Sequence, residues 1–312
     1  NMKNNYFKNY LTLFLVFVVL GFFVPKWALY LMTVSLNYGI IVLGMLLLAR
    51  TGLVSFGHGL YYCLGAYAAG TLKPLFGINE ISIMLLSSIF IPFILATLLG
   101  FLLRRYRDIF FAMLSLAFSM ILYGLLVKTS TLGSTDGFNV DAHTLLGFTL
   151  SNSPFERYII FLLSLFFACI CIFLMIKYLK SSRGMLAEAI RDNELRVEYI
   201  GASVKSTIHI NYVISAVFAG LAGGLTAITV GHIDPEMSYW TTSGEFVFIT
   251  ILSGTGSVFA PFVGAAIFET IRSFAYELSP NTWQMSLGLV MLIVIMFLPD
   301  GIWSLLKKRN KK

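Results

Sequence analysis

The sequence predicts an all-α polytopic membrane protein. Of its residues, 58% are hydrophobic and only 12% are charged, whereas soluble domains carry about a quarter charged residues. Apolar runs close to the ~20 residues that cross a bilayer recur along the chain. They cover residues 11–24, 29–48, 83–103, 109–127, 158–176, 208–230 and 285–298. The alternating pattern of outer-membrane barrel strands does not accompany them.

Positive charge is concentrated next to the apolar runs, mostly on one predicted side. The net charge is +7, with 22 Lys and Arg, and all but five of these fall in segments that we assign to the cytoplasmic side. The exceptions are Lys26, Lys73, Lys128, Arg157 and Arg272. Basic residues beside a membrane attract lipid headgroups, and no basic-aromatic groove indicates nucleic-acid binding. We therefore expect a lipid bilayer and no nucleic acid as partner.

The charged ends also set the number of membrane segments. Two N-terminal lysines and the basic residues 307–312 place both termini in the cytoplasm. The first apolar run is expected to be retained, because no small-residue cleavage site follows it. A single helix across residues 244–277 would leave the tail outside, so we predict two helices split near residues 253–257, at least one of them short. The chain is thus expected to be one domain, residues 1–312, with about ten membrane segments.

Residues 51–70 are rich in Gly and Ala and carry one polar pair, Ser55 and His58. Small residues let helix backbones approach closely in lipid. One interpretation is a helix, whole or broken, beside the path of a transported solute. The alternative is tight packing in which His58 binds a neighbouring backbone. An ionisable residue inside a membrane is still a candidate for function.

The long outer segment, residues 128–157, contains a turn signal at Thr135 and Asp136, between Gly133 and Gly137. The turn either shapes the outer mouth of a path or is an ordinary polar loop.

The longest polar segment is residues 182–201, inside a predicted cytoplasmic coupling region of about residues 178–207. Drawn as one helix, it has two stripes. The apolar stripe holds Leu186, Ala189, Ile190, Val197 and Ile200. The other stripe holds Glu188, Arg191, Asp192, Leu195, Glu198 and Tyr199. Glu188 with Arg191, and Asp192 with Arg196, have the spacing of helical ion pairs, and Gly201 is predicted to end the helix.

Two environments fit this mixed-charge stripe. A helix lying on a membrane surface would be rich in Lys on its polar face. This face instead mixes both signs and exposes Leu195 and Tyr199, which favours a protein partner over the membrane surface.

The apolar run at residues 208–230 carries two ridges of small residues. One ridge holds Ala216, Gly220 and Gly224, and the other holds Ala219, Gly223 and Ala227. Two such ridges predict two close helix contacts or one contact that slides, and static packing explains them equally well.

The predicted break near residues 253–257 places Gly254 and Gly256 beside the path, because non-helical backbone at membrane depth needs protein or a cavity around it. Glu269 and Arg272 lie one helical turn apart and are predicted to pair, which would lock the hairpin. The alternative is a proton relay that uses Glu245 or Glu269.

The sequence carries no catalytic, phosphate-binding or metal-ligating set. Its three cysteines, Cys63, Cys169 and Cys171, lie in apolar surroundings without metal spacing. We therefore expect a transport subunit rather than an enzyme, with no cofactor or metal of its own. If nucleotide hydrolysis drives it, the nucleotide site lies on another chain.

Five stretches, in order, carry a resemblance to a known family. They are TGLVSFGHGLYYCLGAY at residues 51–67, STDGF at 134–138, AEAIRDNELR at 187–196, AGLAGGL at 219–225 and LSGTGSVFAPFVGA at 252–265. Together they resemble the inner-membrane permease subunits of branched-chain amino acid ABC importers, a family that includes urea and amide relatives.

The resemblance implies a type II-like ABC importer permease in the bacterial inner membrane. Its implied partners are a second homologous permease, two cytoplasmic ATPases that hold ATP and Mg, and an extracytoplasmic solute-binding protein. The implied solute is a branched-chain amino acid or a related small polar molecule. The motif match places the ATPase contact at Glu188, Ala189, Arg191, Asp192 and Gly201, and Leu195 and Tyr199 lie on the same stripe.

A second function class stays open at this point. An ion-coupled secondary transporter would use Glu245, Glu269 or His58 and would work without an ATPase. Many such carriers show internal repeats, and no clear repeat is visible in this sequence.

Overall fold

Helices form most of the structure. The structure is a computed structural model that describes residues 15–140, 144–150, 155–278, 280, 282–298 and 301–304. Its helices are a stretch at residues 15–23, α2 (Lys26–Arg50), α3 (His58–Gly70), α4 (Leu72–Phe76), α5 (Ile81–Leu103), α6 (Asp108–Lys128), α7 (Glu156–Leu179), α8 (Ser182–Asp192), α9 (Glu194–Tyr199), α10 (Val204–Val230), α11 (Trp240–Ser253), α12 (Ala260–Leu278) and α13 (Trp283–Phe297). The short elements are η1 (Ser130–Leu132), η2 (Ser134–Asp136), η3 (Pro235–Ser238), β1 (Phe138–Asn139), β2 (Thr144–Leu145), β3 (Phe148–Thr149) and β4 (His232–Ile233).

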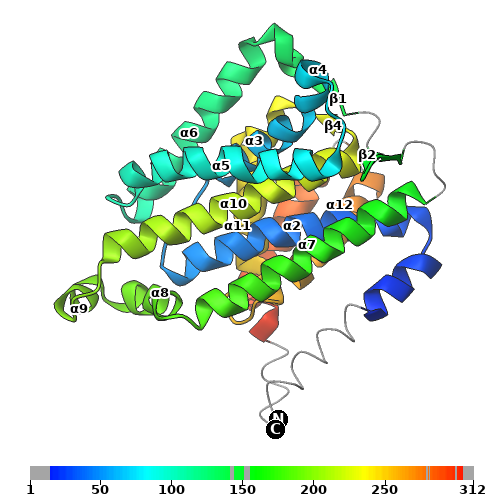
Figure 1. Cartoon of the computed structure of the whole chain (residues 1–312). Coiled ribbons are helices and arrows are strands. Elements are labelled where there is room, and N and C mark those ends of the chain that lie inside the picture. Colours follow the sequence, from blue (N-terminus) through cyan, green and yellow to red (C-terminus); the bar gives the residue numbers. More distant parts are fainter. Residues whose placement is uncertain are drawn as a thin grey trace.

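Helix α10 is the centre of the packing and contacts α2, α3 and α5 (Figure 1). Its two ridges of small residues face different helices. A Cβ on Gly220 would lie 2.4 Å from Pro92 of α5, and a Cβ on Gly223 would lie 1.9 Å from the Tyr62 carbonyl oxygen of α3. The prediction of two close helix contacts is confirmed. Dispersion between closely packed backbones is the attraction that holds such helices together in lipid.

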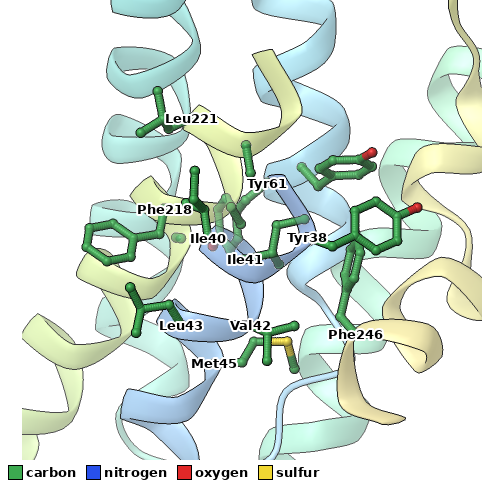
Figure 2. Packing of buried hydrophobic residues seen from close by; sticks show 14 of the residues in the cluster. Tyr38, Ile40, Ile41, Val42, Leu43, Met45, Tyr61, Phe218, Leu221 and Phe246 are labelled. Atoms are coloured by element: carbon green, nitrogen blue, oxygen red, sulfur yellow. The ribbon is translucent and has the colours of Figure 1, made fainter. Parts of the chain in front are cut away.

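Helix α2 is the second buried helix. Figure 2 shows its residues 38–45 among Tyr61 of α3, Phe218 of α10 and Phe246 of α11. Gly44 lets α2 approach α10, because a Cβ there would lie 2.9 Å from the Ser215 carbonyl oxygen. The buried helices α2, α3 and α10 thus form one packed unit.

The two ends of α10 define two sides of the molecule (Figure 1). Its first residue follows α8 and α9, and on that side Arg107, between α5 and α6, pairs with Glu194 of α9. Its last residue leads to β4, where Ile233 pairs with Phe138 of β1. The basic α5–α6 turn therefore lies with α8 and α9, and the loops predicted to be outer lie at the opposite end; which end faces the cytoplasm stays a prediction.

Within the described part of the chain, five helices are long and apolar enough to cross a membrane: α2, α5, α6, α7 and α10. Helices α3 and α11 have 13 and 14 residues, so each is about 20 Å long and spans only part of a ~30 Å hydrocarbon core. The predicted break lies between Ser253 and Ala260, and α11 is the short partner. The count of ten segments stays a prediction. The N-terminal lysines and the basic tail lie outside the described residues.

Candidate functional site

Residues 182–201 form two helices, whereas the sequence pattern predicted one. The Ser181 side chain accepts a hydrogen bond from an amide in the first turn of α8. Asn193 then adopts an extended backbone, with φ −164° and ψ 104°, and its side chain accepts from the Arg196 amide to begin α9. Asparagine favours this capping position over a helix interior, because its side chain competes for backbone hydrogen bonds. We refer to residues 182–201 as the α8–α9 segment.

The break at Asn193 changes which side chains are buried. The buried residues are Gly184, Ala187, Ile190 and Val197, and Leu186 and Ala189 are partly buried. Ile200 was predicted on the apolar stripe but is 73% exposed, because α9 begins a new helical phase and ends before it. Gly201 follows α9 with φ +83°, so the predicted helix stop is confirmed.

The exposed face of the segment carries most of the residues predicted to contact a partner. Leu195 is 66% and Tyr199 is 88% exposed. Glu188, Arg191, Asp192 and Gly201 are also exposed. Large apolar side chains on a mixed-charge surface are typical of protein interfaces.

Two ion pairs attach the segment to the membrane helices. Glu188 lies 3.2 Å from Arg50 at the end of α2, and Glu194 pairs with Arg107. Arg50 also donates a hydrogen bond to the Thr255 carbonyl oxygen, at 2.9 Å, in the loop between α11 and α12. One arginine therefore connects α8, α2 and the break that follows α11.

The ion pairs predicted within the segment are wrong. Glu188 pairs with Arg50 rather than with Arg191. The extended backbone at Asn193 interrupts the helix that would bring Asp192 to Arg196.

A cavity of about 520 Å³ lies on the side of the molecule that carries the α8–α9 segment. Its lining includes Ser55, Gly254 and Gly256, three of the four residues predicted to line a path. The other lining residues are Met45, Leu48, Ala49, Leu53, Val54, Arg191, Val247, Thr250, Ile251, Thr255, Trp303 and Ser304. Non-helical backbone after α2 and after α11 meets here, which fits the requirement for a cavity beside broken helices.

His58, the fourth predicted path residue, is not among the residues that line this cavity. It is fully buried, its Nε2 is hydrogen-bonded to Ser215 of α10, and its ring contacts Tyr61 and Tyr212 edge-on. The structure therefore places His58 in the contact between α3 and α10, although its partner is a side chain and not the predicted backbone.

A buried polar cluster on α10 was not predicted. Asn211 donates to Thr51 at 3.0 Å and accepts from the Tyr178 hydroxyl at 2.5 Å. Asn211 thus joins the non-helical residues that follow α2 to the end of α7, just before α8. The signal was available in the sequence, because a lone amide in an apolar helix needs partners inside the protein.

The predicted outer-mouth residues, Thr135 and Asp136, are exposed in η2, at the end opposite to the α8–α9 segment. Gly137 has φ +66° and ψ −154°, a conformation that favours glycine. A Cβ there would lie 1.9 Å from the Ile233 carbonyl oxygen. The turn is therefore held against the loop after α10, and its role stays a prediction.

Arg272 forms a charged cluster between four helices. Its Nη1 lies 3.3 Å from Glu269 and 3.3 Å from Glu245 of α11, and it donates to the Tyr38 hydroxyl of α2. Its guanidinium lies 5.4 Å from the ring centre of Trp283 of α13. The predicted pair of Glu269 and Arg272 is confirmed, and Glu245 and Tyr38 are additional partners. Among the described residues, no group of three His, Cys, Asp or Glu side chains is placed to hold a metal.

Long apolar helices, two half-length helices and a charged segment at one end are the features of a multi-pass membrane protein. The chain belongs to the family described as branched-chain amino acid transport system / permease component, whose model matches residues 27–296. This membership makes it a transport subunit.

Three relatives are similar over most of their length. Two are named high-affinity branched-chain amino acid transport system permease protein LivM. The chain is 26% identical to the one from Salmonella typhimurium, over 96% of this chain and 76% of that protein, and 26% identical to the one from Escherichia coli, over 93% and 73%. The corresponding protein BraD from Pseudomonas aeruginosa is 23% identical, over 87% of this chain and 92% of that protein. No solved structure is significantly similar to the chain.

Proposed function

We propose that this chain is the membrane subunit of an ATP-driven importer for branched-chain amino acids or a related small polar solute, and that a cytoplasmic ATPase binds its α8–α9 segment. The observation that carries the proposal is the exposure of Leu195 and Tyr199 on a mixed-charge surface that is ion-paired to the membrane helices. The names of the relatives supply the solute class.

The proposed mechanism is alternating access. Closure of two ATPases on bound ATP moves the α8–α9 segment. Glu188 of this segment passes the movement to Arg50, and Arg50 passes it to the Thr255 carbonyl. The loop after α11 lines the cavity, so a shift of this loop opens or closes the cytoplasmic end of the path. Such coupling needs contacts that differ between the two states, and the link through Arg50 can supply them.

The remaining parts of the proposal concern the assembly. The chain acts as one transmembrane unit of residues 1–312 with about ten membrane segments, both termini in the cytoplasm and a coupling region of residues 178–207. It lies in the bacterial inner membrane beside a second homologous permease. Two ATPase subunits hold ATP and Mg, and an extracytoplasmic binding protein delivers the solute to the side that carries Thr135 and Asp136.

An ion-coupled transporter is the competing function. It would need an accessible carboxylate or imidazole that gains and loses a proton. Glu245 and Glu269 both contact Arg272, and His58 is fully buried against Ser215. These contacts favour a structural role for the three groups.

Uptake of radiolabelled leucine into proteoliposomes that hold the complete complex, the binding protein and internal ATP tests the proposal. We expect uptake to require ATP and to be unchanged by a protonophore. Glu188→Lys places two positive charges together at Arg50, so we expect uptake to fall about tenfold while the complex stays assembled. Glu277→Lys, which reverses an exposed charge near the end of α12 and outside the α8–α9 segment, is the matched control. Uptake that stops with the protonophore and ignores ATP would establish the ion-coupled alternative.

A further inference from the structure

Arg191 was predicted to face an ATPase, but its position in the structure indicates an additional role. It lines the 520 Å³ cavity as the only charged side chain among the described residues that do so. Within the described residues, it forms no ion pair, because the nearby Glu188 pairs with Arg50. An arginine that lines a cavity without an acidic partner among the described residues is available to an anionic ligand.

Gly52 packs closely against the side chain of Arg191. Gly52 follows α2 with φ +81°, a conformation that favours glycine. A Cβ at Gly52 would lie 3.3 Å from Cγ and 3.6 Å from Cβ of Arg191. The side chain therefore passes closely over a backbone that has no side chain of its own.

The rest of the lining selects the kind of anion. One part is aliphatic, including Leu53, Val247 and Ile251, and another part offers the hydroxyls of Ser55 and Thr250. No acidic side chain occurs among the described lining residues. The volume falls in the range of ~300–1,000 Å³ that small-molecule sites occupy.

We infer that this cavity is a binding site on the α8–α9 side for an aliphatic solute with a carboxylate, and that Arg191 binds the carboxylate. The aliphatic lining receives the side chain of the solute. The carbonyl end of α11 borders the cavity at Gly254, and its partial negative charge suits an ammonium group on the same solute. The inference rests on the proposed function, and within its solute class it selects carboxylates and excludes uncharged solutes such as urea and amides.

The experiment uses the complete complex in nanodiscs without ATP and follows tryptophan fluorescence, because Trp303 lines the cavity. The probes separate the groups of leucine: 4-methylpentanoate lacks the ammonium, 3-methylbutylamine lacks the carboxylate, and acetate lacks the aliphatic part. We expect a saturable change with 4-methylpentanoate and at least tenfold weaker binding of the amine and of acetate. The Trp303→Phe variant identifies the source of the signal.

Substitutions on α8 assign the binding residue. We expect Arg191→Ala to weaken binding of 4-methylpentanoate about tenfold or more and Arg191→Lys to weaken it less, because lysine keeps the charge but loses the planar donor pair. Arg183→Ala is the matched control, since Arg183 is exposed on the same helix and does not line the cavity. Retention of the ATPases in size-exclusion chromatography verifies that each variant complex assembles. If the Arg191→Ala complex does not assemble, the binding measured with Arg191→Lys decides the result.

The outcomes separate the inference from the proposed function. Unchanged binding in an assembled Arg191→Ala complex, or equal binding of the amine, overturns the inference, even if ATP-driven leucine uptake is intact. Glycerol 3-phosphate serves as an additional probe for a lipid-headgroup site. If acetate and glycerol 3-phosphate bind as tightly as 4-methylpentanoate, the cavity is a general anion or headgroup site, and the inference is overturned. Arg191-dependent binding in a complex that takes up no carboxylate supports the inference and contradicts the proposed solute.

Discussion

Helix α10 and the α8–α9 segment are neighbours in the chain, but different contacts hold them. Helix α10 meets α3 and α5 where Gly220 and Gly223 leave no room for a methyl group. The α8–α9 segment buries few side chains, carries two ion pairs and exposes Leu195 and Tyr199. Close-packed contacts permit one arrangement, whereas ion pairs whose carboxylates are reached by water contribute little. The segment is therefore the part that can move against an unchanged bundle.

The ion pairs of the two regions differ in the same way. Glu245 and Glu269 are only 17% and 12% exposed beside Arg272, whereas Glu188 is 65% exposed beside Arg50. A buried charge depends on its partner, but water replaces the partner of an exposed charge. We expect the first group to maintain the fold and the second to transmit movement.

The largest effect is expected from Arg272→Met, which leaves two carboxylates without a cation inside the bundle. Breaking a buried ion pair costs about 3–5 kcal/mol, and we expect about 3 kcal/mol because Arg272 is one-third exposed. The measurement is the free energy of unfolding in detergent. Arg50→Met is the matched substitution in the other region and should cost less than about 1 kcal/mol. If both variants lost the same free energy of unfolding, the proposed difference between the buried and the exposed ion pairs would be contradicted.

The next effect concerns the glycine contacts of α10. A Cβ at Gly65 of α3 would lie 2.0 Å from the Gly220 carbonyl oxygen, so Gly65→Ala must separate two helices. We expect a loss of about 1–3 kcal/mol in the free energy of unfolding. Gly124→Ala in α6, where no atom lies within 4 Å of the added Cβ, should be neutral or slightly stabilising. A neutral Gly65→Ala would show that the α3–α10 contact is looser than described.

The double substitution Leu195→Ala, Tyr199→Ala tests the α8–α9 segment itself. Both side chains are exposed, so the free energy of unfolding of the permease should stay within about 0.5 kcal/mol. Truncation of apolar anchors at an interface costs more than about 1 kcal/mol, so the affinity for the ATPase should fall about tenfold. Leu98→Ala, an exposed position on α5, should change neither quantity. A loss of permease stability without a loss of ATPase affinity contradicts the assignment.

The smallest effect is expected at the opposite end of the molecule, where Glu80 binds the β2–β3 hairpin. Hydrogen bonds from the Leu146 amide, and then from Thr144 and the Gly147 amide, lower the pKa of Glu80 below its ordinary value. A lowered pKa stabilises the hairpin above the ordinary carboxyl pKa, and the effect is lost as the pH falls through the lowered value. Hydrogen exchange at the Leu146 amide should therefore stay protected down to about pH 5 and lose protection only below it. The Glu80→Gln variant should show no such pH dependence, and loss of protection above pH 6 in the wild type would contradict the assignment.

The sequence predicted the parts of the fold that local chemistry determines. The ridges of small residues predicted the two helix contacts of α10, and the glycines near residue 254 predicted the break after α11. The spacing of Glu269 and Arg272 predicted their pair. Periodicity missed the break at Asn193, because a capping asparagine interrupts an otherwise continuous charge pattern. The partners of Arg272 and Glu188 come from distant helices, so spacing within one helix could not reveal them.

The candidate site was less predictable than the fold. Ser55, Gly254 and Gly256 were chosen separately, and only the packing of α2 against α11 brings them to one cavity. The motif match gave Arg191 one role, whereas the structure packs its side chain against Gly52 of another segment and places it in the lining of that cavity. A residue that serves two surfaces cannot be recognised from its motif alone.

The most direct test of the account is a photocrosslink from position 199 in the intact cell, with a benzoylphenylalanine in place of Tyr199 and the same group at Leu98 as control. We predict a single adduct from position 199 that contains an ATPase subunit, and no such adduct from position 98. Crosslinks from position 199 to an extracytoplasmic protein, or to lipid alone, would contradict the proposal that an ATPase binds the α8–α9 segment.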